Sequence, residues 1–402
     1  MTHNKKKVAV FFGGRSPEHD VSVYTGLEVL QAIDTSLYEA FPVYIATHGQ
    51  WYIGDALRNK NNYMFSRDTV KQLTPVQLDI SAKGKGRLLP ETSGLFSKAK
   101  PVEFDIALPA FHGLNGEDAG FQGLMEFANI AYAGMRAKGC AVFMDKDTTK
   151  KALEGSNVPQ LPHAVAIRPE NSLMIDEKDV KALVDIVGLP CIVKPAHLGS
   201  SIGVGKATTL DEARALLASL FQYDDKAILE PFVANLVEYN VALRVTPNGS
   251  IETSAIERPK TSKDLLDFKE KYMSGGNKKL GGQKSVAGMI SMTRDINPDL
   301  GKDKEKQLRD WAVTVFERLD PAGAPRIDFI GNSKTGELWF NELNPIPGSY
   351  GYFLWEAAKK PVLFTEMLND LLTEAQRFHK RKQIPHDPVQ KDAQLLKRHL
   401  SE

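Results

Sequence analysis

The chain has 402 residues, of which 42% are hydrophobic, so it is long enough for two or three domains with sizeable cores. The formal net charge is +1, with both signs mixed along the sequence, which argues against nucleic acid or a membrane surface as a partner. No stretch approaches the ~20 apolar residues of a membrane span. Cys140 and Cys191 stand in apolar runs, which predicts two buried thiols and a cytoplasmic location.

The first third of the chain predicts an α/β layer. Residues 7–14 ("KVAVFFGG") have the pattern of a buried parallel strand that ends in glycines, and residues 20–34 carry apolar side chains at helical spacing. Two further strands and a helix are expected at 39–46, 104–112 and 121–130. This order places a ligand site at the carboxyl ends of the strands. Residues 54–100 are polar and predict little beyond a flexible loop at "SAKGKGR".

The rest of the chain predicts two α+β units. The first has a helix within 144–159, and its later strands and helices are expected at 163–167, 176–188, 189–195, 210–221 and 226–232. The second has two hairpins, over 238–257 and 325–344, with a helix at 304–319 between them. The lysine- and glycine-rich residues 260–286 predict either a lid or disorder. The charged tail after Phe378 predicts a loosely packed helix.

A glycine-rich loop and two lysines are candidates for binding phosphate. In "VKPAHLGSSIGVGK" a strand delivers Lys194, and glycines followed by Ser200 and Ser201 would let backbone N–H groups and hydroxyls surround an anion. The loop is not a Walker A motif, because its spacing fails. An ordinary turn remains the alternative. Lys146 in "MDKD" would be a solvated lysine on its own, but together with Lys194 it could clamp phosphates.

The second predicted hairpin gathers oxygen side chains. Residues two apart in a strand share a face, so Arg326 lies beside Asp328, and Glu342 lies beside Asn344. Pairing the two strands would bring three oxygen ligands together, which suits Mg²⁺ shared with substrate phosphates. An exposed acidic rim is the alternative. The turn at Gly348 would then present a backbone N–H to the reacting phosphate group.

Two loop residues beyond the predicted parallel strands are candidates for binding an amino acid. Glu18 lies in "GGRSPEHDVS" and His112 in "PAFHGLNGED". Together they could hold an ammonium and a carboxylate. A helix cap for Glu18 and an ordinary loop histidine remain the alternatives.

The chain resembles the D-alanine–D-alanine ligases of the ATP-grasp superfamily. Seven motifs stand in the family's order: "FFGGRSPEHDVSVYTG", "HGLNGEDAGFQG", "MDKDTTKKAL", "VKPAHLGSSIGVGK", "DFKEKY", "RIDF" and "NELNPIPG". The resemblance implies an α/β and α+β chain with the ATP-grasp fold and an N-terminal parallel-sheet domain. It implies an N-terminal substrate domain at 1–138, a central ATP-grasp subdomain at 139–236, a C-terminal subdomain with lid and metal site at 237–376, and a tail at 377–402.

The resemblance also implies roles for individual residues. ATP would contact Lys146, Lys194, Ser201, Glu230, Glu238 and Lys271. Two Mg²⁺ (or Mn²⁺) ions would be held by Asp328, Glu342 and Asn344. A hydrogen-bonded trio of Glu18, Ser200 and Tyr272 would orient the first amino acid, with Val21 and His112 near it. Arg326 and the Gly348 N–H would stabilise a tetrahedral intermediate.

The implied activity is ATP-dependent joining of two D-alanines through an acylphosphate for peptidoglycan, by a cytoplasmic homodimer. The sequence departs from the family on the acceptor side. Where the family usually has a serine that binds the acceptor carboxylate, this chain has Phe353, followed by Leu354. An ATP-grasp ligase with another, less polar acceptor is therefore the alternative. A nucleotide-binding regulatory protein without turnover is a third reading, which the retained lysines and oxygen ligands disfavour.

Overall fold

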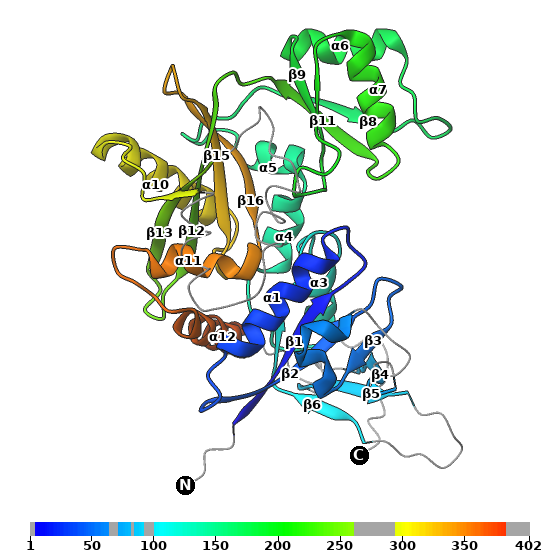
Figure 1. Ribbon diagram of the computed structural model, residues 1–402, viewed down its shortest axis with the longest axis vertical. Helices are drawn as coiled ribbons and strands as arrows, with labels where there is room; N and C mark the ends of the chain where they lie inside the picture. Colours follow the sequence, from blue (N-terminus) through cyan, green and yellow to red (C-terminus); the bar gives the residue numbers. More distant parts are fainter. Residues whose placement is uncertain (1–4, 64–70, 82–83, 92–99, 261–293, 383–402) are drawn as a thin grey trace, which may run out of the picture.

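Three β-sheets, each with its own helices, make up the computed structural model (Figure 1). The structure describes residues 5–63, 71–81, 84–91, 100–260 and 294–382. Within these residues no helix is long and apolar enough to cross a bilayer. The strands of the three sheets follow one another along the chain. The fold is thus the expected combination of α/β and α+β layers, while the predicted domain boundaries stay predictions.

The first sheet has seven strands in the order β6-β5-β4-β3-β2-β1-β7. Among the strands that the structure describes, only β1 pairs in parallel, with β2 and β7, and the other neighbouring strands are antiparallel, so the sheet is mixed. Its strands are β1 (Lys6–Gly13), β2 (Tyr38–Ile45), β3 (Trp51–Ile53), β4 (Thr74–Leu78), β5 (Gly86–Pro90), β6 (Val102–Phe104) and β7 (Ile106–Pro109). The strands β4 and β5 lie where the sequence predicted little structure. In β4 only Val76 is buried, so the sequence lacks the alternation of apolar and polar residues that would predict a strand there.

Helix α1 (His19–Ala32) follows the carboxyl end of β1 and packs back against β1 and β2. The Ser22 hydroxyl accepts from the Gly13 N–H and donates to the Ala110 carbonyl, both at 2.8 Å. Gly26 allows the close approach, because a Cβ there would lie 2.4 Å from the Phe12 ring. The opposite face of the sheet packs on α3 (Gly120–Phe127) through Phe121 and similar core residues. The residues just before α1 and just after β7 therefore meet at one edge, as predicted.

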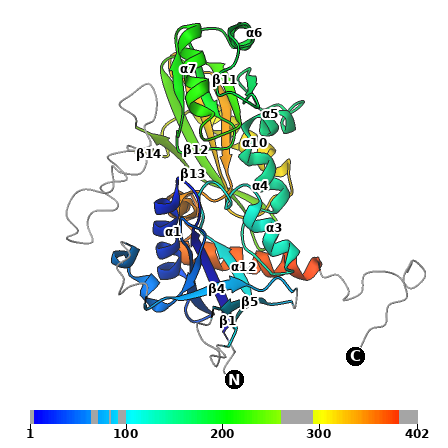
Figure 2. The ribbon, with the colours of Figure 1, turned by 90° about the vertical axis from the view of Figure 1, so that its right-hand side faces the viewer.

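The second sheet has the order β10-β9-β11-β8 and is antiparallel throughout. It comprises β8 (Ala164–Ile167), β9 (Cys191–Pro195), β10 (Gly205–Ala207) and β11 (Lys226–Pro231), packed under α6 (Glu177–Val187) and α7 (Leu210–Leu220). Figures 1 and 2 show this unit at one end of the molecule, with both helices on its outer face. Its inner face looks toward the third sheet.

The third sheet has the antiparallel order β14-β13-β12-β15-β16. It comprises β12 (Leu236–Val245), β13 (Ile251–Pro259), β14 (Arg294–Ile296), β15 (Arg326–Asn332) and β16 (Leu338–Asn344). One face packs against α10 (Lys302–Glu317) in a core that also includes residues of α4 (Ala137–Met144). The short helix α5 (Lys146–Ala152) continues from α4 toward the second sheet. The buried, unpaired Cys140 and Cys191 agree with the expected thiols.

The end of the described chain returns to the first sheet. After β16 come a 3₁₀ turn η3 (Gly348–Gly351), α11 (Tyr352–Glu356) and α12 (Phe364–Arg381). Trp355 and Leu368 from these helices share one core with Val10 and Leu27 from β1 and α1. The first and third sheets are therefore joined by a continuous apolar core. The sequence predicts a loosely packed helix for the tail after Phe378; α12 continues to Arg381 with Lys380 and Arg381 exposed, and residues 383–402 lie outside the described residues.

A buried charge cluster joins α5 to the second sheet. Glu230 on β11 forms ion pairs with Lys150 from α5 and Lys194 from β9, and each lysine Nζ lies 2.7 Å from a carboxylate oxygen of Glu230. Burial by itself disfavours the charged carboxylate, but Lys194 and Lys150 outweigh it and lower the pKa of Glu230 to about 2. Because this pKa lies below the ordinary value of 4.5, the pairing stabilises the fold above pH 4.5 and is lost as pH falls toward 2.

We expect Glu230→Gln to lower the free energy of unfolding by ~3 kcal/mol at pH 7, since it leaves two buried ammonium groups without their counter-charge. The difference from the wild type should shrink as pH falls from 4.5 toward 2. Urea unfolding of the nucleotide-free protein at several pH values measures it. The matched control is Asp185→Asn, which breaks an exposed pair with Lys181 on α6 and should change little. A pH-independent effect of Glu230→Gln would contradict the assignment.

Candidate active site

The hairpin of β15 and β16 brings the predicted oxygen side chains onto one face. Asp328 lies opposite Glu342, and Arg326 lies opposite Asn344, as the spacing predicted. The Arg326 guanidinium donates to both carboxylate oxygens of Asp328 at 2.6 Å, and Asn344 Nδ2 donates to Asp328 Oδ2 at 3.0 Å. These contacts fix the position of the Asp328 carboxylate.

The donor set of this hairpin fits a divalent cation. Two carboxylates and a carboxamide are hard oxygen ligands of the kind that Mg²⁺ takes. Glu342 has its Oε2 at 3.5 Å from Lys146 Nζ, a cation across the cleft, whereas Asp328 is paired with Arg326 from its own strand. Their role as metal ligands stays a prediction, but the chemistry and placement are compatible with it.

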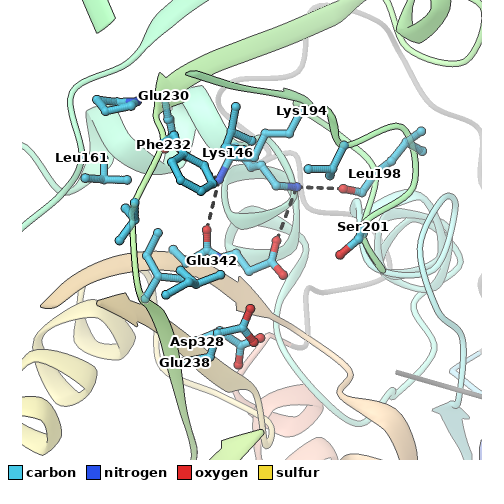
Figure 3. A pocket seen from close by; sticks show the side chains of 18 residues that line it. Lys146, Leu161, Lys194, Leu198, Ser201, Glu230, Phe232, Glu238, Asp328 and Glu342 are labelled. Carbon is cyan, nitrogen blue, oxygen red and sulfur yellow. Dashed lines mark hydrogen bonds and ion pairs between the residues drawn. The ribbon is translucent and has the colours of Figure 1, made fainter. Parts of the chain in front are cut away.

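Two lysines from different elements point into a cleft between the second and third sheets (Figure 3). Lys146 begins α5 and donates to the Leu198 carbonyl at 2.8 Å, while Lys194 on β9 donates to Asn341 Oδ1 at 3.0 Å and pairs with Glu230. Most of the residues for which ATP or metal contacts are expected line this cleft, namely Lys146, Lys194, Ser201, Glu230, Glu238, Asp328 and Glu342. The expected metal ligand Asn344 lines the adjoining cavity instead. The expected ATP contact Lys271 lies outside the described residues.

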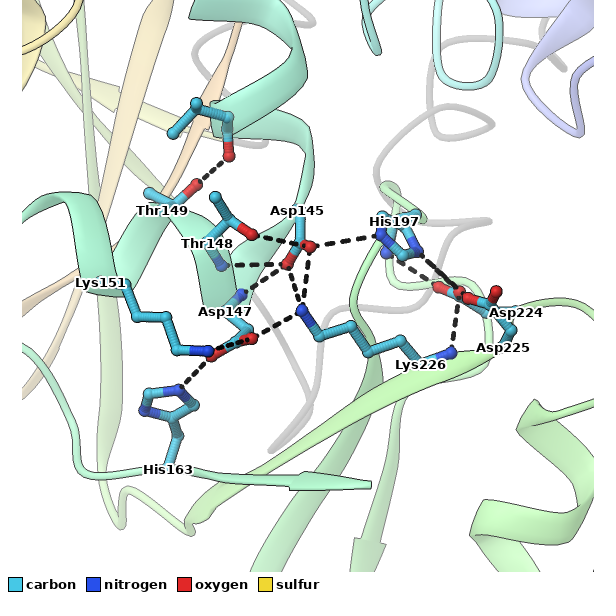
Figure 4. A network of polar contacts seen from close by, with 11 residues as sticks. Asp145, Asp147, Thr148, Thr149, Lys151, His163, His197, Asp224, Asp225 and Lys226 are labelled. Atoms are coloured by element: carbon cyan, nitrogen blue, oxygen red, sulfur yellow. Dashed lines mark hydrogen bonds and ion pairs between the residues drawn. The ribbon is translucent and has the colours of Figure 1, made fainter. Parts of the chain in front are cut away.

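The start of the glycine-rich loop is held by a network of charges (Figure 4). The His197 N–H and ring Nδ1 contact the Asp224 carboxylate at 2.8 and 2.7 Å, and its Nε2 lies 3.5 Å from Asp145. Asp145 and Asp224 raise the pKa of His197 to about 10, so the ring is a cation at neutral pH. Lys226 joins the network through Asp145 and Asp147. His197 thereby ties the loop to the N-terminus of α5, where Lys146 lies.

A second cavity adjoins this cleft on the side of the first sheet and shares Lys146 and Glu342 with it. Glu18 lies here as the residue before α1, where its side chain makes no capping hydrogen bond. Instead the Ser200 hydroxyl, from the glycine-rich loop, donates to Glu18 Oε1. Two members of the predicted trio are thus in contact across the two units, and the third, Tyr272, lies outside the described residues. Gly113 leaves room for the carboxylate, since a Cβ there would lie 2.6 Å from Glu18 Oε2.

His112 is buried in the wall of the second cavity. Its Nε2 lies 2.8 Å from the Thr25 hydroxyl of α1. Burial, together with the nearby charge of Arg326, lowers the pKa of His112 to about 4, so the ring is neutral at pH 7. Any contact with an amino-acid substrate would therefore use a hydrogen bond or packing, not a positive charge.

Glu117 is a site residue that the sequence reasoning missed. Its two oxygens accept from the backbone N–H groups of Gly113, at 2.7 Å, and Ile346, at 2.9 Å, which belong to segments far apart in the chain. Burial and the charge of Glu18 raise the pKa of Glu117 to about 8. The signal in the sequence is an acid inside the glycine-rich stretch "HGLNGED".

The predicted acceptor-side residues Phe353 and Leu354 lie outside the linings of both cavities. Leu354 is fully buried in the core shared by the first and third sheets, so its side chain cannot contact a substrate. Phe353 packs against the same core, with the Arg294 guanidinium 4.8 Å from its ring centre. Val21 is partly buried on α1, and Gly348 and Arg326 line the second cavity. Among the described residues, neither Phe353 nor Leu354 lines either cavity.

Comparison with known proteins agrees with this arrangement. The family model described as "D-ala D-ala ligase N-terminus" matches residues 7–135, and "D-ala D-ala ligase C-terminus" matches residues 153–373. A D-alanine–D-alanine ligase of Thermoanaerobacter sp. (strain X514) is 30% identical over 94% of this chain and 98% of its own length. One of Thermosipho africanus (strain TCF52B) is 32% identical over 91% of this chain and 92% of its own.

Solved structures show the same architecture. The D-alanine–D-alanine ligase of Coxiella burnetii superposes with a TM-score of 0.74 at 23% identity, covering 94% of this chain and 96% of that one. The VanG D-Ala:D-Ser ligase of Enterococcus faecalis gives 0.71 at 25% identity, covering 92% and 100%. The chain therefore belongs to the D-alanine–D-alanine ligase family and has the ATP-grasp fold of that family.

Proposed function

We propose that this chain is an ATP-dependent ligase that joins two D-alanines into D-alanyl-D-alanine for peptidoglycan. The observation that carries the proposal is one continuous site. Lys146 and Lys194 face the acids Asp328 and Glu342 in a cleft that adjoins the cavity holding Glu18. A site with two cations, a row of hard oxygen donors and a neighbouring carboxylate suits a nucleotide triphosphate and an amino acid bound side by side.

In the first step a carboxylate oxygen of the donor amino acid forms a bond to the γ-phosphorus of ATP, and the bond from that phosphorus to ADP breaks. Lys146 and Lys194 would balance charge on the phosphate oxygens, and Glu18 would hold the donor's ammonium. Bound Mg²⁺ would supply further charge neutralisation on the phosphates, held by Asp328, Glu342 and Asn344.

In the second step the amine of the acceptor forms a bond to the acyl carbon, the bond from that carbon to the phosphate oxygen breaks, and the amine loses a proton. The negative charge that develops on the acyl oxygen needs donors already aimed at it. Arg326 and the Gly348 N–H are the proposed donors. Tyr272 and Lys271, for which the family resemblance implies a place in a lid over the acylphosphate, lie outside the described residues.

The turn that carries Gly348 is conformationally unusual, which supports this role. Ser349 and Tyr350 both have left-handed φ values, 47° and 56°, which non-glycine residues rarely adopt. The turn is held from outside: the Ser349 N–H donates to the Thr25 hydroxyl at 3.2 Å, and the Tyr350 hydroxyl donates to the Pro109 carbonyl. Strain of this kind persists only where surrounding contacts impose it, and it recurs at functional sites.

A second candidate is a ligase of the same fold with a different acceptor. Phe353 motivates it, as does the relative whose title names a D-Ala:D-Ser ligase. A panel of amino acids and small amines, each supplied with ATP, Mg²⁺ and D-alanine, separates the candidates. Preference for D-alanine over every other acceptor would remove the alternative, whereas release of phosphate without any D-alanyl-D-alanine would reject the main proposal.

We expect Glu342→Gln to reduce ADP formation by ~100-fold, the kinetic equivalent of ~3 kcal/mol of lost charge stabilisation. Steady-state ADP release with D-alanine and saturating Mg²⁺ measures it. Glu337→Gln is the matched control, because this exposed acid lies at the turn of the same hairpin, away from the cleft. Unchanged ADP formation in Glu342→Gln would revive the reading of a nucleotide-binding protein without turnover.

We expect Thr25→Val to slow dipeptide formation about tenfold, because it leaves the partly buried Ser349 N–H and the His112 ring without the hydroxyl that both contact. The KM for ATP should not change, since Thr25 lies away from the phosphate lysines. Thr25→Ser keeps the hydroxyl and should restore most of the rate. If Ser and Val were equally slow, or if the KM for ATP rose in parallel, the hydroxyl would not be positioning the turn.

A further inference from the structure

Arg294 is a cation at the edge of the third sheet that the proposed mechanism does not use. It begins the edge strand β14, and its side chain is about a quarter exposed, at 27%. One side of its guanidinium lies over the Phe353 ring, with 4.8 Å from Cζ to the ring centre, and its Nη1 pairs with Glu257 Oε1 at 3.0 Å. Arg294 therefore contacts both the Phe353 ring on α11 and the buried Glu257 carboxylate on β13.

A row of polar side chains links Arg294 to the proposed reaction centre. Asn240 lies opposite both Glu257 and Asp328 across the central strand β12, and Asp328 lies opposite Glu342. In the amide orientation in which both the side-chain oxygen and the side-chain nitrogen of Asn240 have hydrogen-bond partners, the nitrogen donates to Asp328 Oδ1 at 3.2 Å. Because opposed residues of an antiparallel sheet share a face, Glu257 lies on the same face as the acids of the cleft. Arg294 stands at the far end of that face.

The proposed reaction needs an acceptor amino acid next to the acyl group that the turn at Gly348 would present. The donor's binding groups, Glu18 and His112, lie toward the first sheet. The chain leads from Gly348 through η3 directly into α11, which carries Phe353. Asn297, just after β14, donates to the Ala357 carbonyl at 3.1 Å and so holds β14 against the end of α11. Arg294 is therefore held against Phe353 of α11, the helix that directly follows the turn proposed to present the acyl group.

The chemistry of this pair suits a carboxylate. A guanidinium has five N–H donors in one plane, and the described residues give Arg294 one ion pair. Stacking on Phe353 covers a face of the plane and leaves edges for a carboxylate fork. We propose that Arg294, backed by Phe353, binds the carboxylate of the acceptor amino acid. This inference rests on the proposed ligase function and deepens it by assigning the acceptor's anchoring group.

The test compares a free carboxylate with its neutral amide. The wild type and Arg294→Gln are assayed for peptide-bond formation with ATP, Mg²⁺, D-alanine as donor, and either D-alanine or D-alaninamide as acceptor. The variant should raise the KM for the D-alanine acceptor roughly 10- to 100-fold, the range for losing a charged hydrogen-bond pair, while leaving the KM for D-alaninamide within about twofold. Acylphosphate formation, trapped as the hydroxamate with hydroxylamine, should not change. If the wild type prefers another amine, that amine and its carboxyl amide replace the pair.

Control variants separate binding from folding. Arg258→Gln removes a guanidinium on the adjacent strand β13, where it pairs with Asp295, and should behave as the wild type. Arg294→Lys keeps the charge beside buried Glu257 but loses the fork, and should retain part of the carboxylate preference. Equal KM increases for acid and amide, or no increase for either, would overturn the proposal.

Failure of the ligase proposal would be seen separately. If the wild type forms neither dipeptide nor hydroxamate from any amine of the panel, the proposed function fails. Calorimetric titration of the ADP–Mg²⁺ complex with D-alanyl-D-alanine and its carboxyl amide then decides the assignment of Arg294. A preference of the wild type for the free carboxylate that Arg294→Gln abolishes supports it. Equal behaviour of the two proteins, including no binding by either, overturns it.

Discussion

The pairing of β15 with β16 is the constraint on which the rest of the site depends. It sets Asp328 opposite Glu342 and Arg326 opposite Asn344, and a slip of one residue would turn these side chains to the opposite face. The other face of the same hairpin packs Ile327, Phe329 and Phe340 into the core under α10. The apolar side chains therefore fix the register, and the register fixes the row of oxygen donors.

The opposing wall of the cleft is organised by charge. Glu230 holds Lys194 and Lys150, and His197 holds the start of the glycine-rich loop between Asp145 and Asp224. Each pair is partly or fully buried, so removing one partner would leave a charge in a poorly solvated place. The lysines proposed to bind phosphate are therefore placed before any nucleotide arrives, which reduces the entropy lost on binding.

The first sheet contributes through contacts that cross between units. Ser200 donates to Glu18, Glu117 accepts from Gly113 and Ile346, and Thr25 contacts both His112 and Ser349. The apolar core that joins α1 to α11 and α12 holds these segments at a fixed separation. In the proposed reaction this core would keep the donor amino acid, the phosphate and the turn at Gly348 in one geometry. The Arg294–Phe353 pair would then form the side of the site that binds the acceptor.

The sequence by itself determined what depends on short spacing. Residues two apart on a strand predicted the shared face of Asp328 and Arg326, and apolar runs predicted most strands and helices, because local periodicity follows from backbone geometry. Only the tertiary structure decided the rest. It paired Glu230 with two lysines, gave Glu117 its two backbone donors, built β4 and β5 into the first sheet, and buried Leu354 while setting Phe353 under Arg294. These features join residues tens to hundreds of positions apart, and no local pattern encodes which distant partner a side chain will meet.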